Sequence, residues 1–275
     1  IERASVSIGV TGTHGKTTTS GLISYITDHC GMEPTVLVGG EMERFGKNSR
    51  LGRGDVVVAE VDESDGFFRE IPLTHAIVTN VEREHMEHYG TMERLLEAYR
   101  SFIGKVASKG ILAFNGDDAT LRDLVKSAKS EKLSFGLSGK HDASCAIKEH
   151  RKKIEFEMFL KGRSVGTVRS PLIGLHNVVN ILGASALCVE MGMSPERVFE
   201  AVEMFKGVKR RFDTVGRVGG IRIVEDYAHH PTELRSVIKA AKDFSEGRVL
   251  AVFQPHRYSR TFDLEAEFSE CFYGS

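Results

Sequence analysis

The stretch TGTHGKTTTS, residues 11–20, decides the fold of this chain. A short apolar run before it predicts a buried strand over Ser5–Thr11, and the pattern after it predicts a helix over Thr17–His29. Gly-Lys-Thr at a strand-to-helix turn sets backbone N–H groups and the positive end of a helix against an anion. Lys16 would reach the β- and γ-phosphates of a nucleotide, and the Thr17 hydroxyl would ligate Mg²⁺.

The turn departs from the strict phosphate-loop spacing GxxxxGK[ST], because Val10 stands in the place of the first glycine. Gly12 and Gly15 remain. The alternative is a glycine-rich helix start with an exposed lysine. The strand before the turn and the helix after it favour a phosphate-binding loop.

Strands and helices alternate after this loop. Apolar, β-branched runs predict buried strands within 55–64, 74–82 and 110–118, and helical spacing of apolar residues predicts an amphipathic helix over 91–107. Residues 143–168 change to period-two stretches that predict an antiparallel meander, and helices return at 176–191 and 194–205. The expected fold class is α/β, a phosphate-loop type of mostly parallel sheet flanked by helices with a small antiparallel meander.

A basic, glycine-rich segment at 206–220 predicts a boundary between two domains. We expect one domain over 1–208, which contains the phosphate-binding loop, and the first part of a second domain over 209–275. Within the latter, the patterns predict strands at 220–226 and 248–254, a helix from Pro231 and another after Thr261. This second unit is about half the size of a usual α/β domain, so we expect a truncated Rossmann-like domain.

The composition excludes several classes of partner. The 275 residues carry a formal net charge of −1, which gives no reason to expect binding to nucleic acid or to an anionic membrane. No apolar run has the length of a membrane span. The four cysteines are far apart, which is typical of free thiols in the cytoplasm.

Two acidic loops follow predicted strands. EVDESD (60–65) supplies four carboxylates, of which Glu60 ends the apolar run, at the edge where α/β sheets bind ligands. TNVEREHMEHYG (79–90) places His85 among acids at the end of the next strand. Each also has a simpler interpretation, a solvated acidic turn for the first and surface histidines for the second, because Mg²⁺ prefers oxygen ligands.

Two short motifs in the second unit gather histidine and arginine. In HHPTE, His229 and His230 precede a helix, whose positive end would face a cleft. In HRYSR, His256, Arg257 and Arg260 lie within one turn, an arrangement that can hold a carboxylate or a phosphate. A salt-bridged helix start is the alternative for both.

Seven stretches in order resemble the motifs of the Mur ligases: GTHGKTT, EVDESDGFF, TNVEREHMEHYG, GLHNVVN, GVKRRF, EDYAHHPTE and FQPHRYSRT. The last two most resemble the alanine-adding branch of that family. The resemblance covers nearly the whole chain. It implies that 1–208 is the family's central ATP-binding domain and that 209–275 is the N-terminal part of its substrate-binding C-terminal domain, and it implies a role for individual residues. It implies ATP binding by Gly12, Thr13, His14, Gly15, Lys16, Thr17, Thr18, Asn177, Asn180, Arg211 and Asp226. It implies metal binding by Thr17, Glu60 and His85, with Glu63 as the alternative acid, and catalysis by Lys16, Glu60 and His85. It implies substrate binding by Tyr227, His229, His256, Arg257 and Arg260.

The resemblance also implies an activity. The family's alanine-adding branch uses ATP and Mg²⁺, two ions of it, to join L-alanine to the carboxylate of UDP-N-acetylmuramate through an acyl phosphate, in peptidoglycan precursor synthesis. Some branches use a modified lysine fifteen residues after the loop histidine, where this chain has Arg100. The family's UDP-binding first domain has no counterpart here and part of its C-terminal domain is missing, so we expect residues 1–275 alone to be inactive as a ligase.

Two other functions stay open at this point. One is a related ligase that recycles murein by attaching a tripeptide. The other is a nucleotide-binding module that uses ATP as a conformational switch without ligase chemistry.

Overall fold

The phosphate loop connects the central strand of a large sheet to a helix that packs on it. The computed structural model describes residues 4–273. Its ten-stranded sheet has the order β10-β9-β8-β7-β6-β5-β1-β4-β2-β3. The strands are β1 (Val6–Thr11), β2 (Thr35–Met42), β3 (Lys47–Arg50), β4 (Val56–Glu60), β5 (His75–Val78), β6 (Ile111–Asn115), β7 (Glu131–Phe135), β8 (Ala143–Glu149), β9 (Ile154–Leu160) and β10 (Arg163–Ser170).

The central strands are parallel and the outer ones are not. Parallel pairing joins β1 to β4 and β5, β2 to β4, and the series from β5 through β8. Strands β8, β9 and β10 pair antiparallel with one another, as β2 does with β3. The predicted meander is therefore confirmed, and it extends the same sheet.

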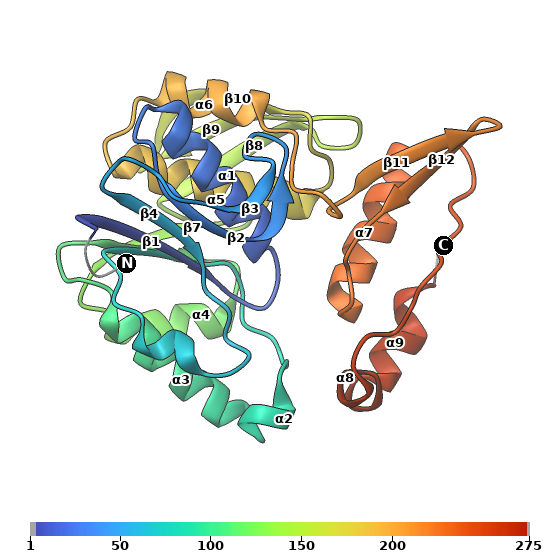
Figure 1. The fold of residues 1–275 in the computed structure, drawn as a ribbon, viewed down its shortest axis with the longest axis horizontal. Coiled ribbons are helices and arrows are strands. Elements are labelled where there is room, and N and C mark those ends of the chain that lie inside the picture. The colour runs from blue at the N-terminus through green and yellow to red at the C-terminus, as the bar shows by residue number, and fades with distance from the viewer. Residues whose placement is uncertain (1–3, 274–275) are drawn as a thin grey trace.

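Helices cover both faces of the sheet (Figure 1). The first face carries α1 (Lys16–His29), α5 (Leu175–Glu190) and α6 (Pro195–Met204), whose apolar side chains form one buried core. The second face carries α3 (Met92–Lys105) and α4 (Ala119–Leu124) over another core, next to the short elements η1 (Phe67–Glu70), α2 (Met86–Tyr89) and η2 (Val125–Ser127). A doubly wound α/β architecture is thus confirmed.

The second unit follows the connection 205–212, which we call the hinge. It contains β11 (Asp213–Val218), β12 (Ile221–Glu225), α7 (Pro231–Phe244), α8 (Tyr258–Asp263) and α9 (Glu265–Cys271). Figure 1 shows this unit beside the sheet, with α7 toward the central domain. The predicted division at 208 and 209 falls within the hinge, while its outer limits, Ile1 and Ser275, lie outside the described residues.

Two predictions for the second unit were wrong. Residues 248–254 form no strand: no strand in 4–273 lies beside them to satisfy their backbone, and Leu250 and Val252 are exposed. Part of the presumed boundary segment is β11, which pairs antiparallel with β12, so no parallel Rossmann-like sheet is present in this part of the described chain. The helix expected after Thr261 is confirmed as α9, and the short helix α8 precedes it.

Candidate active site

The phosphate loop is held open by the neighbouring strand. Gly12 has φ 130° and lies against Thr79 and Asn80, so that a Cβ there would clash with both. The Thr13 amide donates to the Asn80 carbonyl (3.0 Å) and the His14 amide to Asn80 Oδ1 (2.8 Å). Gly15 begins α1 with φ 80°, a conformation that favours glycine.

Lys16 lies inside this loop and is paired with a buried acid. Its Nζ donates to the Gly12 carbonyl (2.6 Å) and to both carboxylate oxygens of Glu63 (3.0 Å each). Burial alone would lower the pKa of Lys16, but the charge of Glu63 offsets this and the pKa is raised. Glu63, only 1% exposed, thus stands where an anionic group of a nucleotide could replace it.

Glu60 lies on the other side of the loop. Its carboxylate accepts the Thr17 hydroxyl (3.1 Å), the Ser20 hydroxyl (3.3 Å) and the Gly39 amide (2.7 Å). The predicted pair of a threonine hydroxyl and a carboxylate is therefore present in one place. Both alternatives for the metal acid lie beside the loop, Glu60 at Thr17 and Glu63 at Lys16.

His85 reaches the same region from the loop after β5. It is buried, has φ 59°, and places Nε2 3.7 Å from Glu63 Oε1. Burial lowers the pKa of His85, which keeps the imidazole neutral and able to ligate a cation. Lys16 and His85 thus both contact Glu63. Thr17, which follows Lys16 in the chain, donates a hydrogen bond to Glu60.

These side chains fit divalent metal ions. Asp62, Glu63 and His85 each offer a ligand atom within 4.8 Å of the others. Thr17 and Glu60 offer a second set of oxygen donors, which suits Mg²⁺. The exposed Arg100 on α3 belongs to neither set and does not line the pocket described next.

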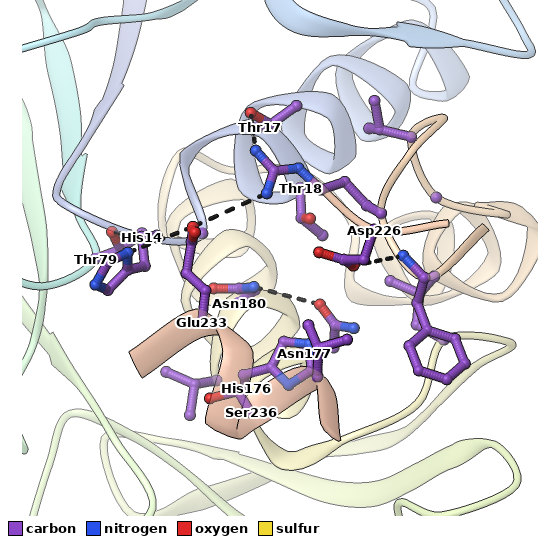
Figure 2. A pocket seen from close by; sticks show the side chains of 18 of the residues that line it. His14, Thr17, Thr18, Thr79, His176, Asn177, Asn180, Asp226, Glu233 and Ser236 are labelled. Atoms are coloured by element: carbon purple, nitrogen blue, oxygen red, sulfur yellow. Dashed lines mark hydrogen bonds and ion pairs between the residues drawn. The ribbon is translucent and has the colours of Figure 1, made fainter. Parts of the chain in front are cut away.

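A pocket of about 220 Å³ adjoins the loop (Figure 2). Side chains from the start of α1, from α5, from α7 and from the hinge point into it. Asn177 donates to the Ile173 carbonyl (2.9 Å), and Asn180 donates to Asn177 Oδ1 (3.4 Å), so both amides are held in place on α5. Burial lowers the pKa of His176, beside them, to about 4, so its ring is neutral.

The hinge and the turn after β12 contribute charged side chains to the pocket. Arg211 donates from Nη2 to the Thr17 hydroxyl (3.3 Å) and lies over the ring of Tyr227. Asp226 accepts the amides of Phe212 and Ala228 (2.7 Å each), and burial raises its pKa. Arg211 and Asp226 therefore face the pocket, as the predicted ATP contacts require, while Tyr227 is partly exposed beside it.

The predicted substrate residues of the second unit form one group, in which both arginines are already paired. The rings of His229 and His256 lie 6.2 Å apart, with Tyr227 beside both. Arg257 pairs with Glu87 at 2.6 Å, and Arg260 is buried with its Nε 3.0 and 3.1 Å from the two oxygens of Glu84. Arg257 Nη1 also lies 3.3 Å from His85 Nδ1, so this group adjoins the metal-binding residues.

The sequence motifs contain three functional candidates whose roles were not predicted. Glu233 lines the pocket and contacts three segments, although it was quoted only as part of a motif. The structure forms a capping box between His230 and Glu233 at the start of α7, but histidine is not among the usual N-cap residues, so the sequence pattern does not mark it. Thr79 and Asn80 hold the loop from the segment after β5, and they begin the motif TNVEREHMEHYG, which was considered only for its acids and histidines.

Comparison with known proteins assigns both parts of the chain. Residues 10–188 match the model of the Mur ligase middle domain, and residues 210–272 match that of the Mur ligase, glutamate ligase domain. The UDP-N-acetylmuramate–L-alanine ligase of Jannaschia sp. is 42% identical over 98% of this chain and 57% of its own length. The chain thus spans little more than half the length of such relatives.

Solved structures give the same result. The UDP-N-acetylmuramate-alanine ligase of Thermotoga maritima is 30% identical, with a TM-score of 0.81 over 94% of this chain and 59% of that one. A UDP-N-acetylmuramate:L-alanyl-gamma-D-glutamyl-meso-diaminopimelate ligase of Neisseria meningitides is 28% identical, with a TM-score of 0.67 over 74% of this chain and 67% of that one. In 4–273, no helix is both long and apolar enough to cross a bilayer.

Proposed function

The chain belongs to the Mur ligase family, and from this premise we propose that the protein joins L-alanine to the carboxylate of UDP-N-acetylmuramate at the expense of ATP. One observation carries the proposal. The phosphate-loop lysine, two candidate metal acids and the loop histidine, which come from three separate segments, lie in one connected group beside the pocket.

The nucleotide would lie in the pocket with its phosphates on the loop. Asn177 and Asn180 would face the base, and Arg211 would turn from Thr17 toward the phosphates. Lys16 would exchange Glu63 for the γ-phosphate. Phosphate oxygens, like carboxylate oxygens, accept hydrogen bonds from a charged amine, so the lysine would bind them from its present position. Thr17 with Glu60, and His85 with Glu63 and Asp62, would hold two Mg²⁺ ions.

The reaction has two steps. The muramyl carboxylate attacks the γ-phosphorus and ADP leaves, giving an acyl phosphate; the amine of alanine then attacks the acyl carbon, loses a proton, and phosphate leaves. Mg²⁺, when bound, neutralises charge on the transferring phosphoryl group. Lys16 adds a fixed positive charge at the same oxygens. The acyl phosphate must be protected from water, which the second unit would achieve by closing over the loop.

The second unit would also bind the acceptor substrates. Arg257 and Arg260 now hold Glu87 and Glu84, and a substrate carboxylate or phosphate would compete for them. Tyr227, His229 and His256 border the same space. We place the reaction in the cytoplasm, in keeping with the four free cysteines.

The experiment is phosphate release by the full-length protein. Release should require both UDP-N-acetylmuramate and L-alanine, and Lys16→Ala should lower it by at least about a hundredfold, because the loop loses its charge at the γ-phosphate. Phosphate release at the same rate with and without the two substrates would contradict the ligase function and favour an ATP switch. Faster turnover with the tripeptide than with alanine would favour the recycling ligase.

A further inference from the structure

The side chain of His14 lines the pocket and faces the second unit. Its amide is already bonded to Asn80. Its imidazole Nδ1 lies 3.4 Å from Glu233 Oε1 in α7, and its Nε2 lies 3.3 Å from Glu82 Oε2 in the loop after β5. The side chain is 12% exposed. We therefore expect the imidazole to bind protein carboxylates, although the motif suggested a nucleotide contact.

The two carboxylate oxygens of Glu233 have different partners. Oε2 accepts the amides of His229 (3.0 Å) and His230 (3.3 Å) and so caps α7. Oε1 does not serve the cap; it faces His14 and lies 3.9 Å from Arg211 Nη1. The cap alone therefore does not account for the position of this carboxylate.

A second contact ties the same turn of α7 to the central domain. The Thr232 hydroxyl donates to Glu82 Oε2 (2.7 Å), the oxygen that also faces His14. The rings of His14 and His230 lie 4.5 Å apart. The first turn of α7 thus rests on the phosphate loop over a small, almost fully polar contact.

We propose that His14 and Glu233 form a latch, a pair of positioning residues that holds the first turn of α7 against the phosphate loop and so keeps the nucleotide pocket closed. The effect of the latch on catalysis rests on the proposed function. Its effect on the contact between the two units does not.

The charges around His14 suit this role. Burial tends to lower the pKa of His14, but Glu233 and Glu82 raise it to about 9, so the imidazole is protonated at neutral pH. The groups facing it are Glu82 from the loop after β5, and Glu233 and His230 from α7, with Arg211 of the hinge behind Glu233. A cation between two carboxylates from different segments links those segments.

Cleavage of the hinge by trypsin can measure opening. The hinge offers Lys206, Lys209, Arg210 and Arg211. Its backbone is hydrogen-bonded to both units, from the Lys209 amide to the Glu41 carbonyl and from the Tyr227 amide to the Arg210 carbonyl, so we expect cleavage to become faster when the units separate. The rate, followed by mass spectrometry on the full-length protein, then reports the open population.

The test compares His14→Gln, Glu233→Gln and the double variant. Glutamine at 233 keeps an amide oxygen for the cap of α7. Each single change should speed hinge cleavage about five- to tenfold, and the double variant should be no faster than the faster single one, because both remove the same interaction. His141→Gln is the matched control, since His141 pairs with Asp117 (3.0 Å) outside this contact, and its rate should stay at that of the unchanged protein.

Two results would overturn the latch. One is a cleavage rate in the double variant that equals the product of the two single effects. The other is a cleavage rate in His141→Gln that rises as much as in the latch variants. A second measurement separates the latch from the proposed function. In the full-length enzyme, His14→Gln should lower kcat about tenfold and change the KM for ATP less than about threefold. A tenfold rise in the KM for ATP would instead indicate that His14 contacts the nucleotide directly. If no ligase activity exists but the cleavage pattern is found, the function fails and the latch stands.

Discussion

At the scale of single residues, the site depends on charges held close together before any nucleotide arrives. Lys16 is buried against Glu63, and Thr17 is bonded to Glu60. The loop is thus preorganised, because its lysine does not have to be recruited from solvent on binding. The motif Gly-Lys-Thr predicted the positions of Lys16 and Thr17 without help from the fold.

The partners of these residues could not be predicted in the same way. Glu63 and Glu60 are three residues apart in one acidic run, and only the end of β4 decides that Glu60 reaches Thr17 while Glu63 reaches Lys16. The direction of the His14 side chain depends on α7, more than two hundred residues later in the chain. No local pattern contains that information.

The latch should weaken as the pH rises. The unfolded-state pKa of histidine is about 6.5 and that of folded His14 is about 9. A raised folded-state pKa stabilises the folded form fully below about pH 6.5, and this stabilisation is lost as the pH rises through 9. Hinge cleavage, corrected with a peptide substrate for the pH dependence of trypsin, should therefore rise from about pH 6.5 to pH 9.5.

The His14→Gln variant is the control for this pH profile. It has no imidazole to titrate, so its corrected cleavage rate should change little over the same range. A variant profile that rises as steeply as that of the unchanged protein would assign the pH dependence to another group.

At the scale of elements, the buried parallel strands and the antiparallel meander were predictable and β11 was not. The runs around β1, β4, β5 and β6 are apolar throughout because helices cover both faces of the sheet there. β11 was missed because its sequence, DTVGRV, has little apolar character and its register shifts between Thr214 and Gly216. Residues 248–254 have the apolar pattern of a strand, but a pattern does not supply a pairing partner.

The junction of the loop with α5 makes a sharp prediction for Gly15. A Cβ there would lie 2.6 Å from Asn180 Oδ1, at a φ of 80°. Gly15→Ala should cost more than about 2 kcal/mol of unfolding free energy, as the strain of a left-handed alanine is about 1–2 kcal/mol and the clash adds to it. Binding of ADP should be lost. Urea unfolding and calorimetry with ADP measure the two effects.

Gly31→Ala is the matched control for this change. Gly31 has nearly the same φ, 82°, but nothing lies within 4 Å of its Cβ position. Backbone strain alone should lower the unfolding free energy of Gly31→Ala, by about 1–2 kcal/mol, and the variant should keep its affinity for ADP. Equal losses in the two variants would mean that the contact with Asn180 is unimportant.

At the scale of the whole molecule, two arginine pairs next to each other join the units with different strength. Arg260 and Glu84 have side chains that are 4% and 8% exposed. Arg260→Ala should lower the opening free energy of α8 by about 3–5 kcal/mol, because it removes the hydrogen-bonded cation from a buried carboxylate. Hydrogen exchange of the α8 amides measures this opening.

Arg257→Ala provides the comparison, because Arg257 and Glu87 are each 42% exposed. Solvent screens such a pair, and its loss should cost at most about 1 kcal/mol. Losses of similar size in the two variants would show that burial does not set the strength of these contacts. Sequence motifs marked both arginines, but the acids that hold them became visible only when the units were brought together.

The measurement that tests the central claim most directly is the Mg²⁺ dependence of binding of a non-hydrolysable ATP analogue to the full-length protein, by calorimetry. Mg²⁺ should tighten binding at least about tenfold in the unchanged protein, and Glu60→Gln and His85→Gln should each abolish most of that gain, since both are proposed to hold the metal that contacts the phosphates. Glu97→Gln, on the exposed part of α3, should keep the gain. If Glu60→Gln and His85→Gln retained the full effect of Mg²⁺, the loop, the acid and the histidine would not serve one metal–nucleotide complex.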